Sequence, residues 1–456
     1  MRPSHSVGSL GIVALLIGVG LAITAVFAGP GSQKPAAQSP SAGESGQVSK
    51  RKTAAAEENS QPNSATAKAI PPFLVKGISW LVEAQNEDGG WGSGLHAAQK
   101  IRDPHQVKSD PATSAFAATA LIRAGHTPTS GDHQKTVRKA TEFLVSVVES
   151  APDTGATITD MTGTQPQRKL GPLVDTSMAT HYLARVIPLL PDNDELRGRV
   201  HKALDKCLRK LEKAQQKDGS WAAGGWAPVL QAANACNALE LAKANGKKVD
   251  QAVLDRARNY QQGHVDRATG RVEASAGAGV ELYGFSGAQR ASAGSAAAAQ
   301  SLVEDAKKEG KLDKDAKVTA ANLKKVGVGG AQAERLEEAF ASNSAQNARL
   351  GDERLLAGFG NNGGEEFFSY LMTSESLVIS GGKEWKEWDA KMQQRLAKIQ
   401  NSDGSWSGHH CITSPVFCTA AVISCLTTDR EAPLLVKIAK AAASEVKVTD
   451  SKKVPR

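Results

Sequence analysis

The sequence is poor in aromatic residues and cysteine, and it contains no alternation of polar and apolar residues that would predict a β-strand. Phe, Tyr and Trp make up only 5% of the 456 residues. The five cysteines are an odd number, so at least one thiol is free or pairs between molecules. Walker loops, nucleophile elbows and His-Glu-x-x-His motifs are also absent. The common motifs therefore assign no activity.

The charge pattern argues against a nucleic-acid partner. Lys plus Arg number 55 against 47 for Asp plus Glu, which gives a net charge of +8, but the basic residues are spread along the chain rather than gathered in one patch. Hydrophobic residues make up 40% and charged residues 22%, which excludes a wholly disordered chain. We expect one large folded domain.

The N-terminal segment predicts export. Residues 10–28 are uncharged and apolar over 19 positions, near the lower limit for a membrane span. Val26-Phe27-Ala28 also resembles a cleavage site, so a signal peptide over 1–28 is the alternative to a retained anchor. Residues 29–69 have almost no large apolar side chains and predict a disordered tether. We expect the folded part in the cell envelope or periplasm, anchored to the cytoplasmic membrane by residues 10–28.

The folded part is predicted to be all-α. Apolar residues recur at spacings of three and four in about twelve segments, and nearly uncharged segments alternate with segments charged on one face. Two concentric rings of helices, an α/α toroid, would produce this alternation. We place the toroid at 70–430, with a low-complexity insert at about 273–364 that interrupts the helices, and a C-terminal helix and basic tail at 431–456. The expected helices are 71–85, 112–124, 133–149, 175–190, 194–215, 227–244, 250–261, parts of 287–307 and 331–347, 366–379, 385–400, 416–426 and 432–446.

One motif occurs three times, with Lys, Leu, Gln, Gly and Trp at identical offsets. Each Gln is expected to end an outer helix and to bridge to backbone groups of a neighbouring helix end. Each Trp should fold back as a buried plug whose ring N–H needs an acceptor. The copies are Lys76, Leu81, Gln85, Gly89 and Trp91; Lys206, Leu211, Gln215, Gly219 and Trp221; and Lys391, Leu396, Gln400, Gly404 and Trp406.

This spacing resembles the QW repeat of the prenyltransferase and squalene oxidase repeat superfamily, which includes terpenoid cyclases and protein prenyltransferase β subunits. The stretch from Ser380 through Trp388 and the third repeat is especially similar to exported repeat proteins of planctomycete-type bacteria. For that subgroup the resemblance implies the α/α toroid and no established reaction.

The residues that carry chemistry in this superfamily are only partly matched. Class II terpenoid cyclases use a DxDDTA-like motif, and the best-matching stretch places Asp110 on its first carboxylate, with Ala112 and Thr113 in place of the other two. The usual proton donor is therefore missing. Asp192-Asn193-Asp194-Glu195 also has acidic spacing, but its position favours capping of a helix. His181 on an inner helix is either a hydrogen-bonded core residue or a weak catalytic candidate.

Protein prenyltransferases hold zinc with Asp, Cys and His. The best candidate ligands here are His410, Cys411 and Cys418, whose residue types suit zinc but whose spacing matches no standard motif. Core packing is the alternative for Cys418. A disulfide between Cys207 and Cys236 is possible from their places on successive helices.

The remaining carboxylate pairs, Glu365/Glu366 and Glu337/Glu338, are interpreted as helix-start and solvated-face charges.

The sequence thus favours a binding or structural module that uses the toroid cavity or rim for a peptide, protein or apolar ligand. No cofactor is predicted apart from the zinc hypothesis. The alternative is a prenyltransferase or terpenoid cyclase-like enzyme. An enzyme should bring polar groups together in the cavity, whereas a binding module should show an apolar or blocked centre.

Overall fold

The structure, a computed structural model, describes residues 69–221, 224–360 and 362–445. The predicted anchor at 10–28 and nearly all of the predicted tether lie outside these residues. Within them the regular secondary structure is helical, and only isolated β-bridges occur besides. The expectation of an all-α chain is therefore confirmed.

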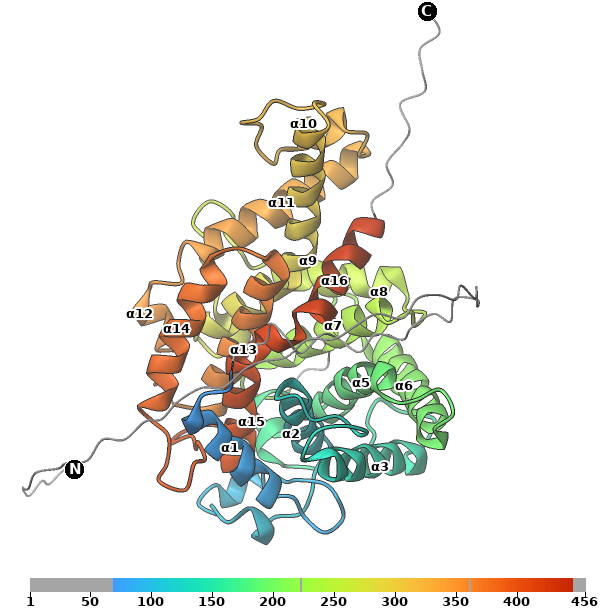
Figure 1. Cartoon of the computed structure of the whole chain (residues 1–456), viewed down its shortest axis with the longest axis vertical. Helices are drawn as coiled ribbons and strands as arrows, with labels where there is room; N and C mark the ends of the chain where they lie inside the picture. The colour runs from blue at the N-terminus through green and yellow to red at the C-terminus, as the bar shows by residue number, and fades with distance from the viewer. Residues whose placement is uncertain (1–68, 222–223, 361, 446–456) are drawn as a thin grey trace, which may run out of the picture. The chain divides into compact units, whose positions relative to one another are not determined.

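Six helices form a closed inner ring in which each packs against the next and the last packs against the first (Figure 1). These helices lack a polar face: every residue of the first and last of them is buried. Such helices must be covered on both sides. The inner helices are α2 (Pro111–Arg123), α5 (Val174–Val186), α7 (Pro228–Ala244), α9 (Glu281–Lys308), α13 (Gly364–Ser380) and α15 (Pro415–Leu426).

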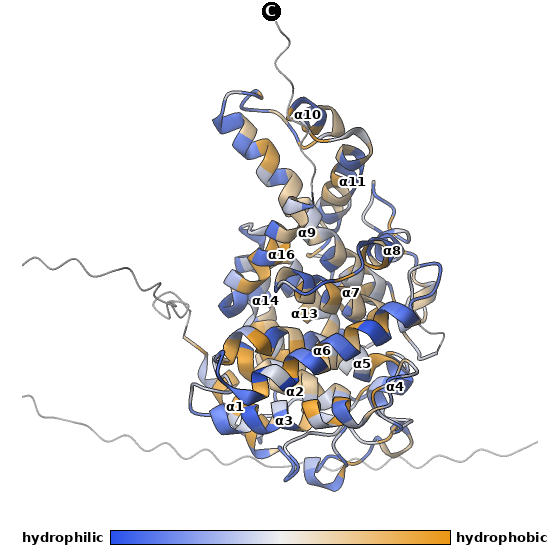
Figure 2. Ribbon diagram, turned by 90° about the vertical axis from the view of Figure 1, so that its right-hand side faces the viewer, coloured by the Kyte–Doolittle hydropathy of each residue, from blue (hydrophilic) through white to orange (hydrophobic). Residues whose placement is uncertain are grey.

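A second set of helices packs on the outside of this ring and alternates with the inner helices along the chain. They bury one face only, and hydrophilic residues dominate the outer helix α6 in Figure 2. The two rings together form the predicted α/α toroid. The outer helices are α1 (Pro72–Glu83), α3 (Gln134–Ser150), α6 (Glu195–Ala214), α8 (Gln251–Gln262), α11 (Gly330–Asn347) and α14 (Glu384–Ala397).

The three repeats join the rings in the same way at three places. The indole N–H of Trp91, Trp221 and Trp406 donates to a carbonyl ten residues earlier, at 2.9, 2.9 and 2.8 Å. These indoles are almost completely buried. Each repeat closes an outer helix and turns the chain toward the ring's interior, as the motif predicts.

The repeat glutamines connect successive outer helices. Gln85 donates to the carbonyl of its own repeat glycine and to that of Thr136, at the start of α3. Gln215 does the same with Val253 in α8, and Gln400 with Phe73 in α1. The third repeat therefore ties the last outer helix to the first, which closes the outer ring.

The stretch predicted as an interrupting insert is helical. α9 runs for 28 residues without a break, because its many alanines favour helix and its first half belongs to the inner ring. Its second half, α10 (Ala320–Lys325) and part of α11 form a lobe that projects from the rings (Figure 1). The lobe has a small core of its own, made of Ala299, Val303, Ala306, Leu312, Leu323, Val328, Ala333 and Leu336.

The interior of the inner ring is filled by side chains. Near the helix N-termini, the ring centroid of Phe116 lies 5.5 Å from that of Phe368 and 4.7 Å from that of Phe417. Phe116 is on α2 and Phe368 on α13, which are separated in the ring by α15, so this contact reaches across the interior. The three rings are buried.

Toward the C-terminal ends, the interior holds an alternating chain of charges, the axial ion-pair network. Glu375 on α13 pairs with Arg123 on α2 and, at 2.8 Å, with Arg290 on α9. Glu431, in the 3-10 helix η6 (Thr428–Glu431) that precedes α16 (Ala432–Ser444), pairs with Arg123 at 2.8 Å. In order, the network is Arg185, Glu431, Arg123, Glu375, Arg290, Glu240, Arg258, Glu445 and Lys243.

The first six members of this network are buried, and each carboxylate bridges two cations. Burial alone penalises ionised carboxylates, but the nearby arginines lower the pKa of Glu375 below its usual value. Charges in such a place are tolerated only when they are paired. The network thus occupies the centre with charges that are paired with one another, although Nη2 of Arg185 and of Arg290 has no hydrogen-bond partner among the described residues.

Candidate functional site

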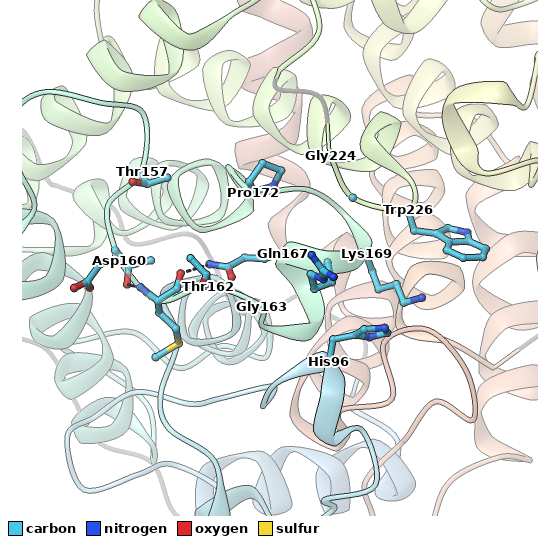
Figure 3. Close-up of a pocket in the computed structure, with 14 residues that line it drawn as sticks. His96, Thr157, Asp160, Thr162, Gly163, Gln167, Lys169, Pro172, Gly224 and Trp226 are labelled. Carbon is cyan, nitrogen blue, oxygen red and sulfur yellow. Dashed lines mark hydrogen bonds between the residues drawn. The ribbon is translucent and has the colours of Figure 1, made fainter.

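The N-terminal ends of the inner helices form a rim, and a pocket of about 710 Å³ opens there (Figure 3). Its volume lies in the usual range for small-ligand sites. One wall is the segment 157–163, and the other comes from α4 (Gln165–Lys169) and from residues 224–226, which precede α7. The lining residues are His96, Thr157, Thr159, Asp160, Met161, Thr162, Gly163, Gln167, Arg168, Lys169, Pro172, Gly224, Gly225 and Trp226.

Local backbone hydrogen bonds hold this pocket in shape. Thr164 and Gln167 form a capping box at the start of α4. The Trp226 N–H donates to the Arg168 carbonyl at 3.1 Å, which fixes the chain on both sides of the pocket. Gly225 has φ +85°, and a Cβ there would lie 2.8 Å from the backbone nitrogen of Gly171, so only glycine fits this close approach.

Lys169 and Trp226 form the basic and aromatic end of the pocket. The Lys169 ammonium lies 4.5 Å from the Trp226 ring centroid, in a cation–π contact. Lys169 is only 8% exposed, whereas Trp226 is 46% exposed. Burial, followed by the charges of Lys169 and Arg168, lowers the pKa of His96. His96 is therefore neutral at neutral pH, and Lys169 is the buried cation of this pocket.

Beside this pocket lies a buried carboxyl pair, Glu365 and Glu366, at the start of α13. Both side chains are inaccessible to solvent. Glu366 accepts hydrogen bonds from the Tyr283 hydroxyl at 2.6 Å and the Phe359 N–H at 2.9 Å. The Ile412 N–H donates to Glu365 at 3.1 Å. One oxygen of each carboxyl has no hydrogen-bond partner among the described residues.

Burial and the charge of Glu366 raise the pKa of Glu365 to about 8, so this carboxyl keeps its proton at neutral pH. The pair does begin a helix, as the sequence indicated, but it is not solvated. The rim loops bring in residues 409–412 and the segment before α13, and these cover it. The burial of this carboxyl pair was not predicted from the sequence.

Asp110 is a helix cap rather than a free acid. Its carboxylate accepts hydrogen bonds from the N–H groups of Ser93 and Thr113, at 2.8 Å each, and from the Thr113 hydroxyl at 2.9 Å. Asp175 lies nearby and accepts from the Ala112 N–H at 3.0 Å. Burial and the neighbouring Asp110 raise the pKa of Asp175 to about 7. Both carboxyls hold the starts of inner helices in place. Asp194 likewise caps α6, as predicted.

His181 lies at the edge of the axial ion-pair network. Its Nε2 is 3.5 Å from Nη1 of Arg185, and the ring is half-buried. Burial and the Arg185 charge lower the pKa of His181 well below its ordinary value. This histidine is therefore neutral, and it is far along α5 from the rim pocket.

The structure places the zinc candidates beside the carboxyl pair. His410 Nε2 lies 3.7 Å from Glu366, and Cys411 adopts φ +57°, an unusual conformation for a non-glycine residue. Cys418 is buried in α15 and donates to the Ile412 carbonyl. Burial and Glu365 raise the pKa of Cys411 to about 12, which keeps the thiol protonated and makes it a poor zinc ligand.

The structure also bears on a metal site elsewhere and on the predicted disulfide. Within 69–221, 224–360 and 362–445, no three His, Cys, Asp or Glu side chains are placed to hold a metal ion. Cys207 and Cys236 are buried and are not joined, so the possible disulfide does not form.

Trp226, Lys169 and Glu365/Glu366 are the residues that sequence reasoning missed. Trp226 stands outside the repeat offsets, as does Trp80, and it is not part of the helix that carries Trp385 and Trp388. Its position outside the repeat could have marked Trp226 as a candidate site residue, because a tryptophan without a structural role in the repeat is free to line a site. No comparable signal marks Lys169.

Comparison with known proteins finds a family model and several loosely similar solved structures. Residues 63–165 match the family model of the squalene-hopene cyclase C-terminal domain. No curated protein matches the chain. Among solved structures, the type II terpene cyclase MstE from Scytonema is similar at 13% identity and a TM-score of 0.32, over 79% of this chain and 98% of that one.

A complex of an MstE variant with its product merosterolic acid A is similar at 13% identity and a TM-score of 0.33, over 79% of this chain and 96% of that one. Overlaps this loose carry no inference about the chemistry of this chain. The closed double ring shows an α/α toroid, and the stretch 63–165 is similar to the squalene-hopene cyclase C-terminal domain.

Proposed function

We propose that this chain is an exported, membrane-tethered toroid that acts as a binding module and takes its ligand at the rim, in the pocket beside Trp226. Residues 10–28 supply the anchor to the cytoplasmic membrane, and the toroid lies in the cell envelope or periplasm. None of the helices that the structure describes is long and apolar enough to span a bilayer.

The filled interior is the observation that carries this proposal. The Phe116 cluster occupies one end of the ring, and the axial ion-pair network occupies the other. An elongated apolar substrate would have to displace buried, mutually paired charges, at a cost of several kcal/mol for each ion left unpaired. The rim pocket needs no such displacement, because it is open in the structure.

The composition of the rim pocket suits a peptide, a protein segment or a partly apolar small molecule. Met161, Pro172 and Trp226 offer apolar contact, while the threonines and backbone of 157–163 offer hydrogen bonds. A mixture of this kind is typical of small-ligand sites. The spread of basic charge continues to argue against a nucleic-acid partner.

The buried carboxyl pair supports a second candidate function, an enzyme that uses acid–base catalysis. Glu365 carries a proton at neutral pH, and His410 and the ionisable Glu366 adjoin it. A carboxyl whose pKa is raised is, however, a weaker acid than usual, and protonation of an alkene requires a strong one. The pair therefore fits proton transfer to oxygen or nitrogen better than the terpenoid cyclase reaction.

A pocket-filling substitution tests the proposal. Thr162→Trp places an indole in the rim pocket, and Thr154→Trp adds the same group to an exposed loop outside it. The full chain, kept soluble with detergent, is titrated by ligand-observed NMR against a panel of short peptides and isoprenoid alcohols. Binding that survives Thr154→Trp and is lost in Thr162→Trp supports the rim site.

The same preparation separates the enzyme alternative. Incubation with polyprenyl substrates, followed by mass spectrometry, should give no cyclised or transferred product, and elemental analysis should give no stoichiometric zinc. A product whose formation stops in Glu365→Gln would replace the binding module with the enzyme.

A further inference from the structure

The Lys169 ammonium lacks a counter-ion in contact. The side chain is 8% exposed, and among the described residues its Nζ has no hydrogen bond and no ion pair, only the Trp226 ring. Most buried ammonium groups are paired, because desolvating an unpaired charge is costly. Lys169 lies near enough to Glu365 to interact with it electrostatically, but the two side chains make no hydrogen bond or ion pair. An unpaired cation inside a ligand-sized pocket would be stabilised by a bound anion.

The neighbours of Lys169 extend the basic end of the pocket. His96 and Arg168 also line it, and the buried Nδ1 of His96 has no partner among the described residues. In Figure 3, Lys169 lies between His96 and Trp226, and Asp160 stands at the opposite end of the labelled group. The lining thus separates a basic, aromatic end from an acidic one.

Building on the proposed binding function, we propose that the rim pocket recognises a carboxylate: the ligand's carboxylate pairs with Lys169 and its adjacent apolar group packs on Trp226. One buried cation balances one negative charge, and a carboxylate is the singly charged group that ammonium binds with short, charge-assisted hydrogen bonds. His96 is neutral and donates or accepts one hydrogen bond at the same end. Arg168 is exposed and adds attraction at longer range.

Two kinds of ligand carry this chemistry: the C-terminal carboxylate of a peptide and a small aromatic or apolar carboxylic acid. In a peptide, the preceding residues would lie along the wall 157–163, whose threonines and backbone offer hydrogen bonds. A small acid would use only the end beside Trp226. The two sources differ in how much of the wall they contact.

The test compares each acid with its amide. N-acetyl-Ala-Ala-Phe and hippuric acid are titrated into the full chain by isothermal calorimetry, each as the free acid and as the carboxamide. The free acid should bind at least about tenfold more tightly than the amide. Lys169→Met should remove that preference, while Lys100→Met, an exposed lysine outside the pocket lining, should keep it.

Lys169→Met should still fold, since it removes an unpaired buried charge and keeps the length of the side chain; an unchanged melting temperature checks this. The tripeptide binding more tightly than hippuric acid identifies a peptide C-terminus as the source, and the reverse order identifies a small acid. If acid and amide bind with equal affinity and Thr162→Trp abolishes the binding of both, the proposal of carboxylate recognition is wrong, but the rim pocket is still the binding site. Absence of binding by every probe, or displacement by inorganic phosphate at lower concentration than by acetate, also overturns it.

Discussion

Replacing Glu365 by glutamine is expected to stabilise the protein at neutral pH. The wild-type carboxyl is buried beside Glu366, and its pKa rises from 4.5 to about 8 on folding. Between these two values the unfolded chain has lost a proton that the folded chain keeps, so the wild-type stability falls as pH rises. Glutamine has the same shape and keeps an acceptor for the Ile412 N–H, but it does not titrate.

The size of the effect follows from the width of this window. Each pH unit between the two pKa values costs the wild type roughly 1.4 kcal/mol of unfolding free energy. At pH 7 the accumulated cost is roughly 3 kcal/mol, and it levels off above about pH 8. The amide hydrogens of glutamine need partners in the same site, which adds a penalty that does not change with pH.

Urea unfolding at pH 4.5, 6, 7 and 8 measures this difference, and the decisive quantity is its slope with pH. The advantage of Glu365→Gln over the wild type should grow from pH 4.5 to 8. Glu337→Gln, at a half-buried position on the outer helix α11, is the matched control. A difference in unfolding free energy between Glu365→Gln and the wild type that stays constant over the whole pH range would refute the raised pKa of Glu365.

Three further outcomes are expected. Gln400→Ala should lower the unfolding free energy by about 1–3 kcal/mol, measured by denaturant titration, because the Phe73 carbonyl loses its donor; a neutral effect would contradict the closure of the outer ring. Glu375→Gln should cost about 3–5 kcal/mol at pH 7, since Arg123 and Arg290 lose a shared partner. Because the pKa of Glu375 is lowered in the folded protein, the stability difference between Glu375→Gln and the wild type should shrink as pH falls below 4.5. A stability difference that does not change with pH would contradict the lowered pKa. Asp110→Ala should lower the melting temperature by removing about 1–2 kcal/mol of helix capping; no change in calorimetry would contradict that role.

The repeats made the architecture predictable, because each one specifies both a helix end and the place where the next helix starts. Five fixed offsets in three copies are enough to alternate inner and outer helices around a ring. The same offsets carry no information on the stretch 273–364, where no repeat occurs. There the local helix propensity of alanine, rather than the poverty in large apolar residues, determined the outcome in α9.

The rim could not be predicted in the same way. Glu365 has the sequence context of an exposed helix start, and its burial results from loops that are distant in sequence, such as the one containing Ile412. Lys169 looks like any other surface lysine until Trp226, 57 positions later in the sequence, packs against it. Asp110 and Asp194 were easier to interpret, since a helix cap is decided by the few residues around it.

The contact between Gln400 and the beginning of α1 has a consequence for biosynthesis. The first outer helix leaves the ribosome more than three hundred residues before the glutamine that anchors it. Until then, Trp406 cannot seat beside Phe73, and the nascent molecule exposes an unfinished edge. Closure of the ring is therefore a late step that requires the C-terminal part of the chain. A chain truncated before residue 400 would leave an open arc of helices with exposed apolar surface at both ends.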